Sequence, residues 1–303
     1  MGSGLSPEAK RVSQMSDRDD LREAADALGG SVVVCGLGAY ADRLAGATFR
    51  DARYATVSAL LAEASDGSAG RPAPAAVVVA LDPETVAEEA ESLRELAAFD
   101  AFTVAVVPAA AADGDALPAV RGLVDAVLLA EGDAVEASIR AFLATVQEPG
   151  FVNLDLTDAE TVLSSGVAAL GTGTADRDAP GDAVDAAFGG LPEGVDATRA
   201  SAVLVDVVVD PETSIAAATD VIAAVRERIG ADANVIWGGA VDEAAADELA
   251  VRLVVAGVRH APPLGAGDPC PRCGEPLSAY RFGSRETLSC DACGYSGIAV
   301  RRD

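Results

Sequence analysis

The chain has 303 residues, of which 50% are apolar and only 4% aromatic, and its 48 acidic and 22 basic side chains give a net charge of −26. This length allows two domains and a small additional module. The charge argues against non-specific nucleic-acid binding by the main body. It is typical of a salt-in halophile, in which concentrated salt screens the self-repulsion. The chain has no run of about 18 apolar residues that would predict a membrane span, and its polar first twenty residues do not resemble a secretory signal, so we expect a halophilic, cytoplasmic protein.

The first half of the chain is predicted to alternate between strands and helices. Residues 1–30 are expected to form a flexible polar tail with a short helix at 21–28. Apolar, β-branched runs predict buried strands, and the segments between them predict helices. The strands are expected at 31–40, 75–81, 102–108 and 124–130, and the helices at 82–99 and 133–146. This alternation favours a parallel, doubly wound sheet over residues 31–148.

The second half continues with fewer strands and longer helices, which predicts a smaller α/β domain over residues 149–262. The helices are expected from about 158 and at 211–229, and the strands at 200–209, 234–241 and 250–258. A Pro/Gly-rich linker at 261–269 then leads to a separate module at 268–303.

One tetrapeptide, Asp-Pro-Glu-Thr, occurs after two valine-rich strands, at 82–85 and 210–213. An aspartate at a helix N-cap accepts hydrogen bonds from free amides, and proline fits the first helical position. We therefore interpret both copies as helix starts and not as functional residues.

Four cysteines near the C-terminus have the spacing C-x2-C-x16-C-x2-C. Two such pairs bring four thiolates into a tetrahedron that suits structural zinc and leaves no open position for catalysis. Disulfides or redox chemistry are the alternative, which a reducing cytoplasm disfavours. The module has five arginines and five acids, so it lacks the acidity of the body and is the expected docking surface for a protein or a nucleic acid. The predicted ligands are Cys270, Cys273, Cys290 and Cys293; Cys35 is expected in the core, and the single histidine, His260, supports no triad.

The segment PGFVNLDLTDAETVLSSGVAALGTGTA, from Pro149 to Ala175, resembles the segment that joins the two domains of FtsZ, the tubulin-like cell-division GTPase. Weaker similarity extends in order over residues 31–259. The resemblance implies a tubulin/FtsZ-like α/β fold, in which a Rossmann-like parallel-sheet domain precedes a smaller α/β domain, here followed by a zinc ribbon. The matching positions are Pro149, Gly150, Asn153, Asp155, Asp158, Thr161, Val162, Gly171 and Gly173.

In that family a glycine-rich loop after a strand of the first domain binds phosphate. The corresponding place here is Asp82-Pro83-Glu84-Thr85, which removes one amide donor and adds two carboxylates, and the first glycine loop is reduced to Gly36-Leu37-Gly38. The phosphate site is therefore predicted to be lost, and we do not expect GTP to be a cofactor. The string Gly171–Thr174 is expected to end a helix and not to bind phosphate.

The resemblance implies that Asn153, Asp155 and Asp158 act in trans, by entering a neighbouring subunit's nucleotide pocket and orienting the attacking water. A local role is equally open, because Thr157 and Glu160 have the spacing of a capping box and Asp158 would favour the helix dipole.

Three functions remain open from the sequence. The first is a pseudo-GTPase that joins or regulates a filament of an FtsZ-type partner at the division site, in cell division or cell shape. The second is a scaffold that binds proteins or nucleic acid through the zinc ribbon and has no connection with filaments. The third is an active GTPase with an unusual pocket.

Overall fold

The computed structural model describes residues 32–66, 73–97, 99, 101–112, 116–245, 247–260, 266–267, 270, 273, 275–282, 285–294 and 296–298. The predicted tail at 1–30 and most of the predicted linker at 261–269 lie outside these ranges.

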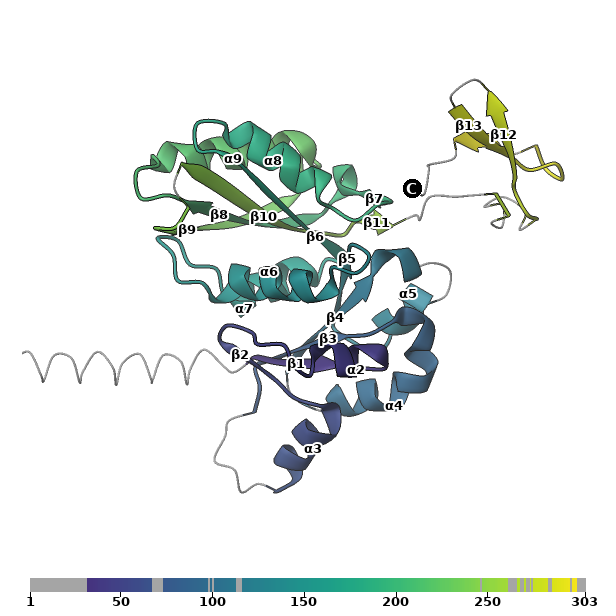
Figure 1. Cartoon of the computed structure of the whole chain (residues 1–303), viewed down its shortest axis with the longest axis horizontal. Helices are drawn as coiled ribbons and strands as arrows, with labels where there is room; N and C mark the ends of the chain where they lie inside the picture. Colours follow the sequence, from purple (N-terminus) through teal and green to yellow (C-terminus); the bar gives the residue numbers. More distant parts are fainter. Residues whose placement is uncertain are drawn as a thin grey trace, which may run out of the picture.

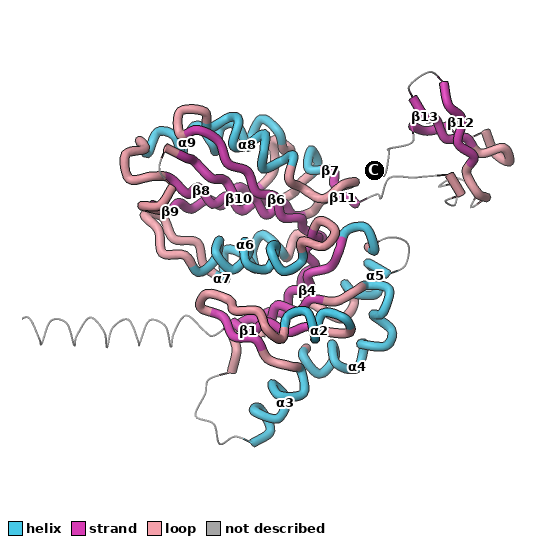
Figure 2. Tube along the Cα trace, in the orientation of Figure 1, coloured by secondary structure: helices cyan, strands magenta, loops and turns pink. Residues whose placement is uncertain are grey.

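A nine-stranded sheet runs through the main body (Figure 1), and Figure 2 shows the same strands as a continuous band. Every neighbouring pair from β2 to β6 is parallel, β10 is antiparallel to both of its neighbours, and β8 and β9 are parallel. The predicted parallel sheet of the first half is thus confirmed. In spatial order the strands are β2 (Ala52–Tyr54), β1 (Val32–Gly36), β3 (Ala76–Ala80), β4 (Phe102–Pro108), β5 (Ala126–Ala130), β6 (Val167–Asp176), β10 (Glu248–Ala256), β8 (Ala202–Val209) and β9 (Asn234–Val241).

Helices cover both faces of the sheet because its strands are apolar on both sides. Successive strand residues alternate between two buried clusters, one on each face, as the pleat requires. The first face packs against α3 (Val57–Asp66), α4 (Val86–Leu96), α5 (Ala116–Arg121), α8 (Pro180–Gly189) and α9 (Ile215–Arg228). The second face packs against α2 (Ala39–Leu44), α6 (Val135–Gln147) and α7 (Leu156–Leu163).

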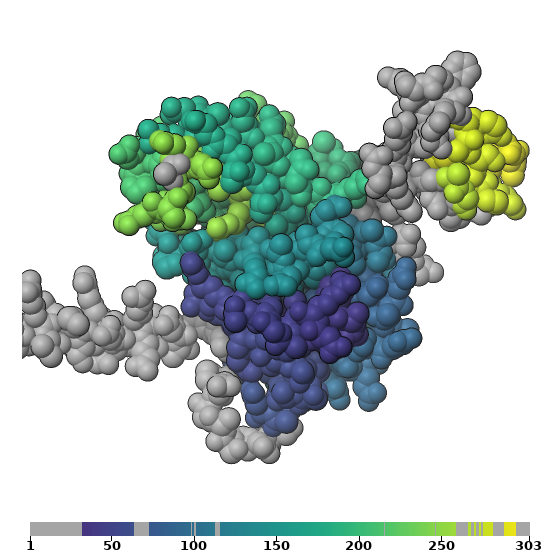
Figure 3. All heavy atoms as spheres, in the orientation of Figure 1, coloured from purple at the N-terminus to yellow at the C-terminus, as the bar shows by residue number. Residues whose placement is uncertain are grey.

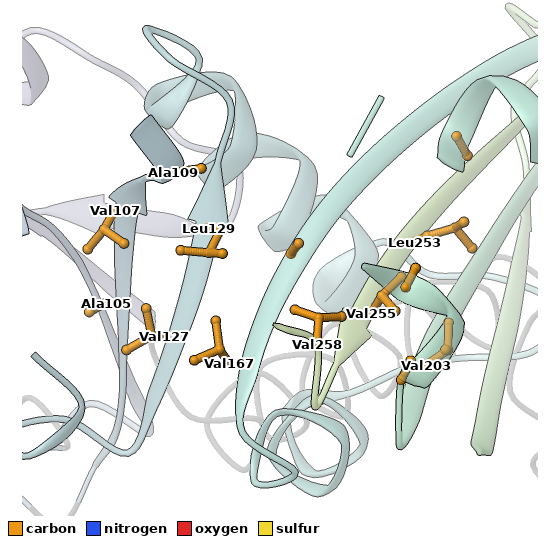
Figure 4. Close-up of a cluster of buried hydrophobic side chains, with 14 of the residues drawn as sticks. Ala105, Val107, Ala109, Val127, Leu129, Val167, Val203, Leu253, Val255 and Val258 are labelled. Atoms are coloured by element: carbon orange, nitrogen blue, oxygen red, sulfur yellow. The ribbon is translucent and has the colours of Figure 1, made fainter. Parts of the chain in front are cut away.

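The two halves of the body share one core. Strand β5 pairs with β6, and α6 contacts β4, β6 and β10. In the space-filling view of Figure 3 the teal atoms lie as a band between the blue and green parts. A domain division at residue 148, directly after α6, stays a prediction. Figure 4 shows the first cluster passing through the junction from Ala105, Val107, Val127 and Leu129 to Val167, and on to Leu253, Val255 and Val203.

The prediction that Gly171–Thr174 ends a helix is wrong, because these residues lie inside strand β6. Helix α8 crosses the strand so closely that side chains would not fit. A Cβ on Gly171 would lie 2.2 Å from the carbonyl oxygen of Ala187, and one on Gly173 would lie 2.2 Å from the amide nitrogen of the same residue. The glycines therefore permit helix–strand contact and do not form a turn.

The two Asp-Pro-Glu-Thr copies behave differently. Asp82 caps a 3-10 turn, η1 (Pro83–Thr85), that leads into α4, as predicted. The helix predicted at 211–229 instead begins at Ile215 with Ser214 as its N-cap. Asp210 still accepts a hydrogen bond from the amide of Glu212, at 2.6 Å, but this closes a turn that precedes the helix.

Short elements complete the described chain. The 3-10 turns η2 (Ala109–Ala111) and η3 (Ala197–Arg199) follow β4 and precede β8, and β7 (Val195–Asp196) pairs with β11 (Arg259–His260). The cysteine module has a three-stranded antiparallel sheet of β12 (Ser278–Phe282), β13 (Arg285–Ser289) and β14 (Ser296–Ile298). None of the helices in the described ranges combines the length and apolar character needed to cross a membrane.

Candidate functional site

The four cysteines predicted as ligands lie together, with all their sulfurs within 4.8 Å of one another. Cys270 Sγ is 3.6 Å from Cys293 Sγ, and Cys273 Sγ is 3.4 Å from Cys290 Sγ. A tetrahedron with metal–sulfur bonds of about 2.3 Å has edges of about 3.8 Å, whereas a disulfide bond is about 2.05 Å long. The arrangement therefore fits a tetrahedral metal ion and not two disulfides.

The folding of the module explains how the sulfurs converge. The amide of Cys270 donates to the carbonyl of Glu275, and the amide of Gly294 donates to the carbonyl of Cys290, so each pair closes a tight turn. Gly294 has φ +70°, a conformation that glycine adopts without strain. Leu277 and Leu288 pack with Cys270 and Cys290 in a small separate core. The hydroxyls of Ser278 and Tyr280 both donate to the carboxylate of Asp291, which fixes the second turn to the hairpin.

The Cys273 thiol is difficult to ionise without a cation. The amide of Glu275 lowers the pKa of the Cys273 thiol, but hydrogen bonds with Cys290 and Cys293 raise it further, and the resulting pKa is about 12. Four thiolates at this separation need a compensating positive charge. A divalent ion held by all four sulfurs would supply that charge.

The joining segment between α6 and α7 contains the three residues predicted to act in trans. Asp155 is the N-cap of α7, and its Oδ1 accepts from the amide of Asp158 at 3.0 Å. The side chain of Asp158 in return accepts from the amide of Asp155 at 3.1 Å. The capping box predicted at Thr157 and Glu160 is therefore wrong by two residues, because the helix begins at Leu156.

Asn153 organises the turn that precedes this helix. Its Oδ1 accepts from the amide of Gly150 at 2.8 Å. Val152 then exchanges backbone hydrogen bonds with Gly239 of β9. A Cβ on Gly150 would lie 2.1 Å from the carbonyl oxygen of Gly239, so the close approach of the segment to the sheet edge requires glycine.

The three predicted residues are thus brought into one short segment on the surface. Asn153 and Asp155 are exposed and Asp158 is half-buried, although all three make local hydrogen bonds. In each aspartate the capping box uses one carboxylate oxygen, and within the described ranges the structure shows no hydrogen bond to the other. The geometry is compatible with capping and with contact to a second molecule.

The loop after β1 contacts a carboxylate of α4 that the sequence did not indicate. Gly38 has φ +53°, and its amide donates to Glu89 Oε1 of α4 at 3.1 Å. Gly36 is also closely packed, because a Cβ there would lie 2.3 Å from the carbonyl oxygen of Tyr40. After β3, Asp82 Oδ1 accepts from the amide of Glu84. The short glycine loop therefore already contacts an internal anion.

An ion-pair network links the end of α6 to the second half of the sheet. Arg252 Nη1 lies 2.7 Å from Asp206 Oδ2 and 2.9 Å from Glu148 Oε2, and Glu148 also faces Arg50 at 3.4 Å. Burial raises the pKa of Asp206 to about 6, although Arg252 opposes the shift. The sequence signal for this network was Asp206, an acidic residue within the apolar run Ala202–Val209.

Known proteins match this chain in sequence and in fold. A model of the FtsZ family, C-terminal domain, matches residues 166–259. Cell division protein FtsZ 1 of Halobacterium salinarum is 38% identical over 123 residues, which are 40% of this chain and 31% of that protein. Cell division protein FtsZ of Haloferax mediterranei is 33% identical over 123 residues, 40% of this chain and 33% of that protein. The chain therefore spans about a third of the length of these curated relatives.

Solved structures show that the fold is tubulin/FtsZ-like. An empty FtsZ dimer from M. jannaschii superimposes with a TM-score of 0.62 at 18% identity, covering 88% of this chain and 100% of that chain. TubZ of Bacillus thuringiensis serovar israelensis, in GDP-form protofilaments, gives a TM-score of 0.56 at 10% identity over 77% of this chain and 88% of that chain.

Proposed function

We propose that this chain is a non-canonical FtsZ-like pseudo-GTPase that associates with filaments of an FtsZ-type protein and regulates them in cell division or cell shape. The contact between the Gly38 amide and the Glu89 carboxylate carries this proposal. This contact places the negative charge of the Glu89 side chain against the glycine loop after β1. The sequence match to halophilic FtsZ proteins supports the choice of partner.

A nucleotide would meet several carboxylates at this end of the sheet. Glu89 already accepts from the loop amide, and Asp82 and Glu84 stand where the next helix begins. Two like charges about 4 Å apart repel by roughly 4 kcal/mol at an effective dielectric constant near 20. Binding a phosphate here would require breaking the Gly38–Glu89 hydrogen bond and adding further negative charge, so the chain itself is not expected to hydrolyse GTP.

The joining segment supplies the proposed contact with the filament. Asn153, Asp155 and Asp158 are presented on the surface by the edge of β9 and the start of α7. A carboxylate that caps a helix through one oxygen keeps a second oxygen that can accept a hydrogen bond from a water. In the proposed complex these oxygens orient the water that attacks the partner's nucleotide.

The cysteine module is proposed to be a structural zinc ribbon that docks a protein partner. The four-sulfur cluster supports a metal ion, and the preference of tetrahedral thiolate sites supports zinc. We expect about one zinc per chain by metal analysis, reduced in Cys273→Ser and unchanged in Cys35→Ala, whose thiol lies in the core of the body. A full zinc content in Cys273→Ser would contradict this ligand set.

The balanced charge of the module favours a second candidate function. Its five arginines and five acids cancel, so it can approach protein or nucleic acid that the acidic body would repel. In this alternative the chain is a zinc-ribbon scaffold without any role at a filament.

Two measurements in molar KCl separate these functions. GTP with Mg²⁺ is titrated against the purified chain, and we expect no binding in the micromolar range; such binding would instead support an active GTPase. The chain is then sedimented with GTP-assembled filaments of Halobacterium salinarum FtsZ 1. Co-sedimentation is expected, whereas a chain that stays in the supernatant would favour the scaffold. A third observation, made in cells, is the position of tagged protein, which we expect in the cytoplasm and concentrated at the division site.

A further inference from the structure

Two large apolar side chains are exposed on the described part of the main body, and they lie against the same cavity. Phe151 is 43% exposed and Val241 is 50% exposed. Both line a cavity of about 220 Å³ whose other walls include Val209, Pro211 and Ala218. The other exposed large apolar residue of the described chain is Tyr280, in the cysteine module.

The backbone holds the two exposed side chains in place. The hydrogen bonds between Val152 and Gly239 fix the segment that follows Phe151 against β9. The Phe151 ring covers Gly239 so closely that a Cβ there would lie 2.4 Å from the ring. Val241 is the last residue of β9, and Val209 is the last residue of the neighbouring β8. The cavity is therefore formed by the ends of regular elements, with a volume that suits one bulky side chain.

The rim of this cavity is acidic. Glu212, Asp242 and Glu243 are exposed within one or two residues of the apolar walls. The nearby Arg177 is shared among Asp210, Glu212 and Asp247, so of the three rim carboxylates it pairs with Glu212 alone. An incoming basic group would meet the exposed carboxylates of Asp242 and Glu243, whereas a second copy of this chain would bring its own acidic rim into contact with this one.

We propose that this cavity is a docking site for a peptide segment of another protein, with one bulky apolar side chain flanked by Lys or Arg. The apolar side chain enters between Phe151 and Val241 and removes their exposed surface from water. The basic flanks pair with the acidic rim, which selects the partner and excludes acidic or self-complementary segments. This surface is distinct from the loop after β1 and from the metal cluster. Phe151 lies in the joining segment, two residues before Asn153, so the cavity adjoins the proposed filament contact, but it does not rest on the loss of GTP binding.

The test uses the full chain in molar KCl and a displayed library of random heptapeptides. We expect the selected peptides to contain a large apolar residue flanked by Lys or Arg, and labelled copies are then measured by fluorescence anisotropy. Val241→Asp should weaken binding at least tenfold, because it places a charge in the apolar wall. Glu243→Lys should weaken it several-fold, and more strongly as KCl is lowered. The matched control is Ala59→Asp, which makes the same change of charge at an exposed position of α3, in the first half of the body, and should leave the affinity unchanged.

Several outcomes would overturn the proposal. One is a failure to enrich any such peptide. Another is equal affinity in the wild type and Val241→Asp, with circular dichroism showing that both are folded. A third is self-association that Val241→Asp abolishes, which would assign the cavity to a second copy of the chain.

Discussion

The tetrapeptide Asp-Pro-Glu-Thr at the ends of β3 and β8 gives the same local turn in two different settings. Asp82 and Asp210 each accept a hydrogen bond from the amide two residues later, at 3.0 Å and 2.6 Å. Asp82 is half-buried and caps a turn that continues into a helix. Asp210 is 3% exposed and pairs with Arg177. Local sequence therefore decides the turn, whereas its surroundings decide whether a helix follows and whether the acid is buried.

The two halves of the body also differ in how deeply their acidic residues are buried. Both buried acids of the described chain, Asp206 and Asp210, lie on β8 or directly after it. In the first half, Asp82 after β3 accepts from the amide of Glu84 and Glu131 after β5 accepts from the amide of Glu193, and neither acid is buried. The model of the FtsZ C-terminal domain matches residues 166–259, so the second half is similar to FtsZ in sequence as well as in fold.

The largest loss of stability is expected from replacing a glycine, and Gly173 and Gly38 have different roles in the two halves. Gly173→Val in β6 should abolish folding or cost more than about 4 kcal/mol, because its Cβ would overlap the backbone of α8. Gly38→Ala should cost about 1–3 kcal/mol, since only its positive φ is strained and the nearest side-chain atom is 3.7 Å away. Urea unfolding in molar KCl measures both. Equal losses would show that the two glycines have the same role.

The next largest effect on stability is expected from Asp206, a buried acid of a kind that the described first half lacks. The pKa of Asp206 is raised to about 6 from 3.8. The folded state therefore holds this proton more tightly than the unfolded state, and the stability it contributes is present below about pH 4 and is lost as the pH rises through about 6. A difference of two pKa units corresponds to about 3 kcal/mol.

Urea unfolding between pH 4 and 7.5 tests this pH dependence against Asp206→Asn, which keeps the shape of the side chain and cannot ionise. The stability of the wild type relative to this variant should fall as the pH rises from 4 to 6 and should then stay constant. A difference that is independent of pH would contradict the raised pKa.

A smaller loss of stability is expected when the aspartate of either Asp-Pro-Glu-Thr copy is replaced. Asp82→Ala should cost about 1 kcal/mol, the usual value for the loss of an N-cap. Asp210→Ala should lower the unfolding temperature more, because Arg177 also loses a buried partner. Thermal unfolding at one KCl concentration shows which variant has the lower unfolding temperature. A larger decrease in Asp82→Ala would show that the turn contributes more to stability than its surroundings do.

Part of this structure was accessible from the sequence because the signal was local. Apolar, β-branched runs marked β1, β3, β4, β5, β8, β9 and β10, and the cysteine spacing marked the metal cluster. Strand β6 was missed because its glycines resemble a turn unless the position of α8 is known. Glu89 was missed for a similar reason, since its contact with Gly38 joins residues 51 positions apart. Such tertiary contacts leave no pattern in the spacing of nearby residues.

The smallest effect on stability is expected in the joining segment between the two halves, where capping and the proposed action in trans can be separated. Asp155→Asn keeps an amide oxygen that caps α7 and should leave the free energy of unfolding nearly unchanged. Asp155→Ala loses the cap and should cost about 1 kcal/mol. If the second carboxylate oxygen orients a water in the partner's pocket, both variants should abolish the effect of the chain on GTP turnover by Halobacterium salinarum FtsZ 1, because Asp155→Asn replaces that oxygen with an NH2 group, which cannot accept a hydrogen bond, and Asp155→Ala removes it. Urea unfolding and phosphate release measure the two roles independently. A full effect on turnover in Asp155→Asn, with a loss only in the destabilised Asp155→Ala, would leave Asp155 with the helix cap as its only function.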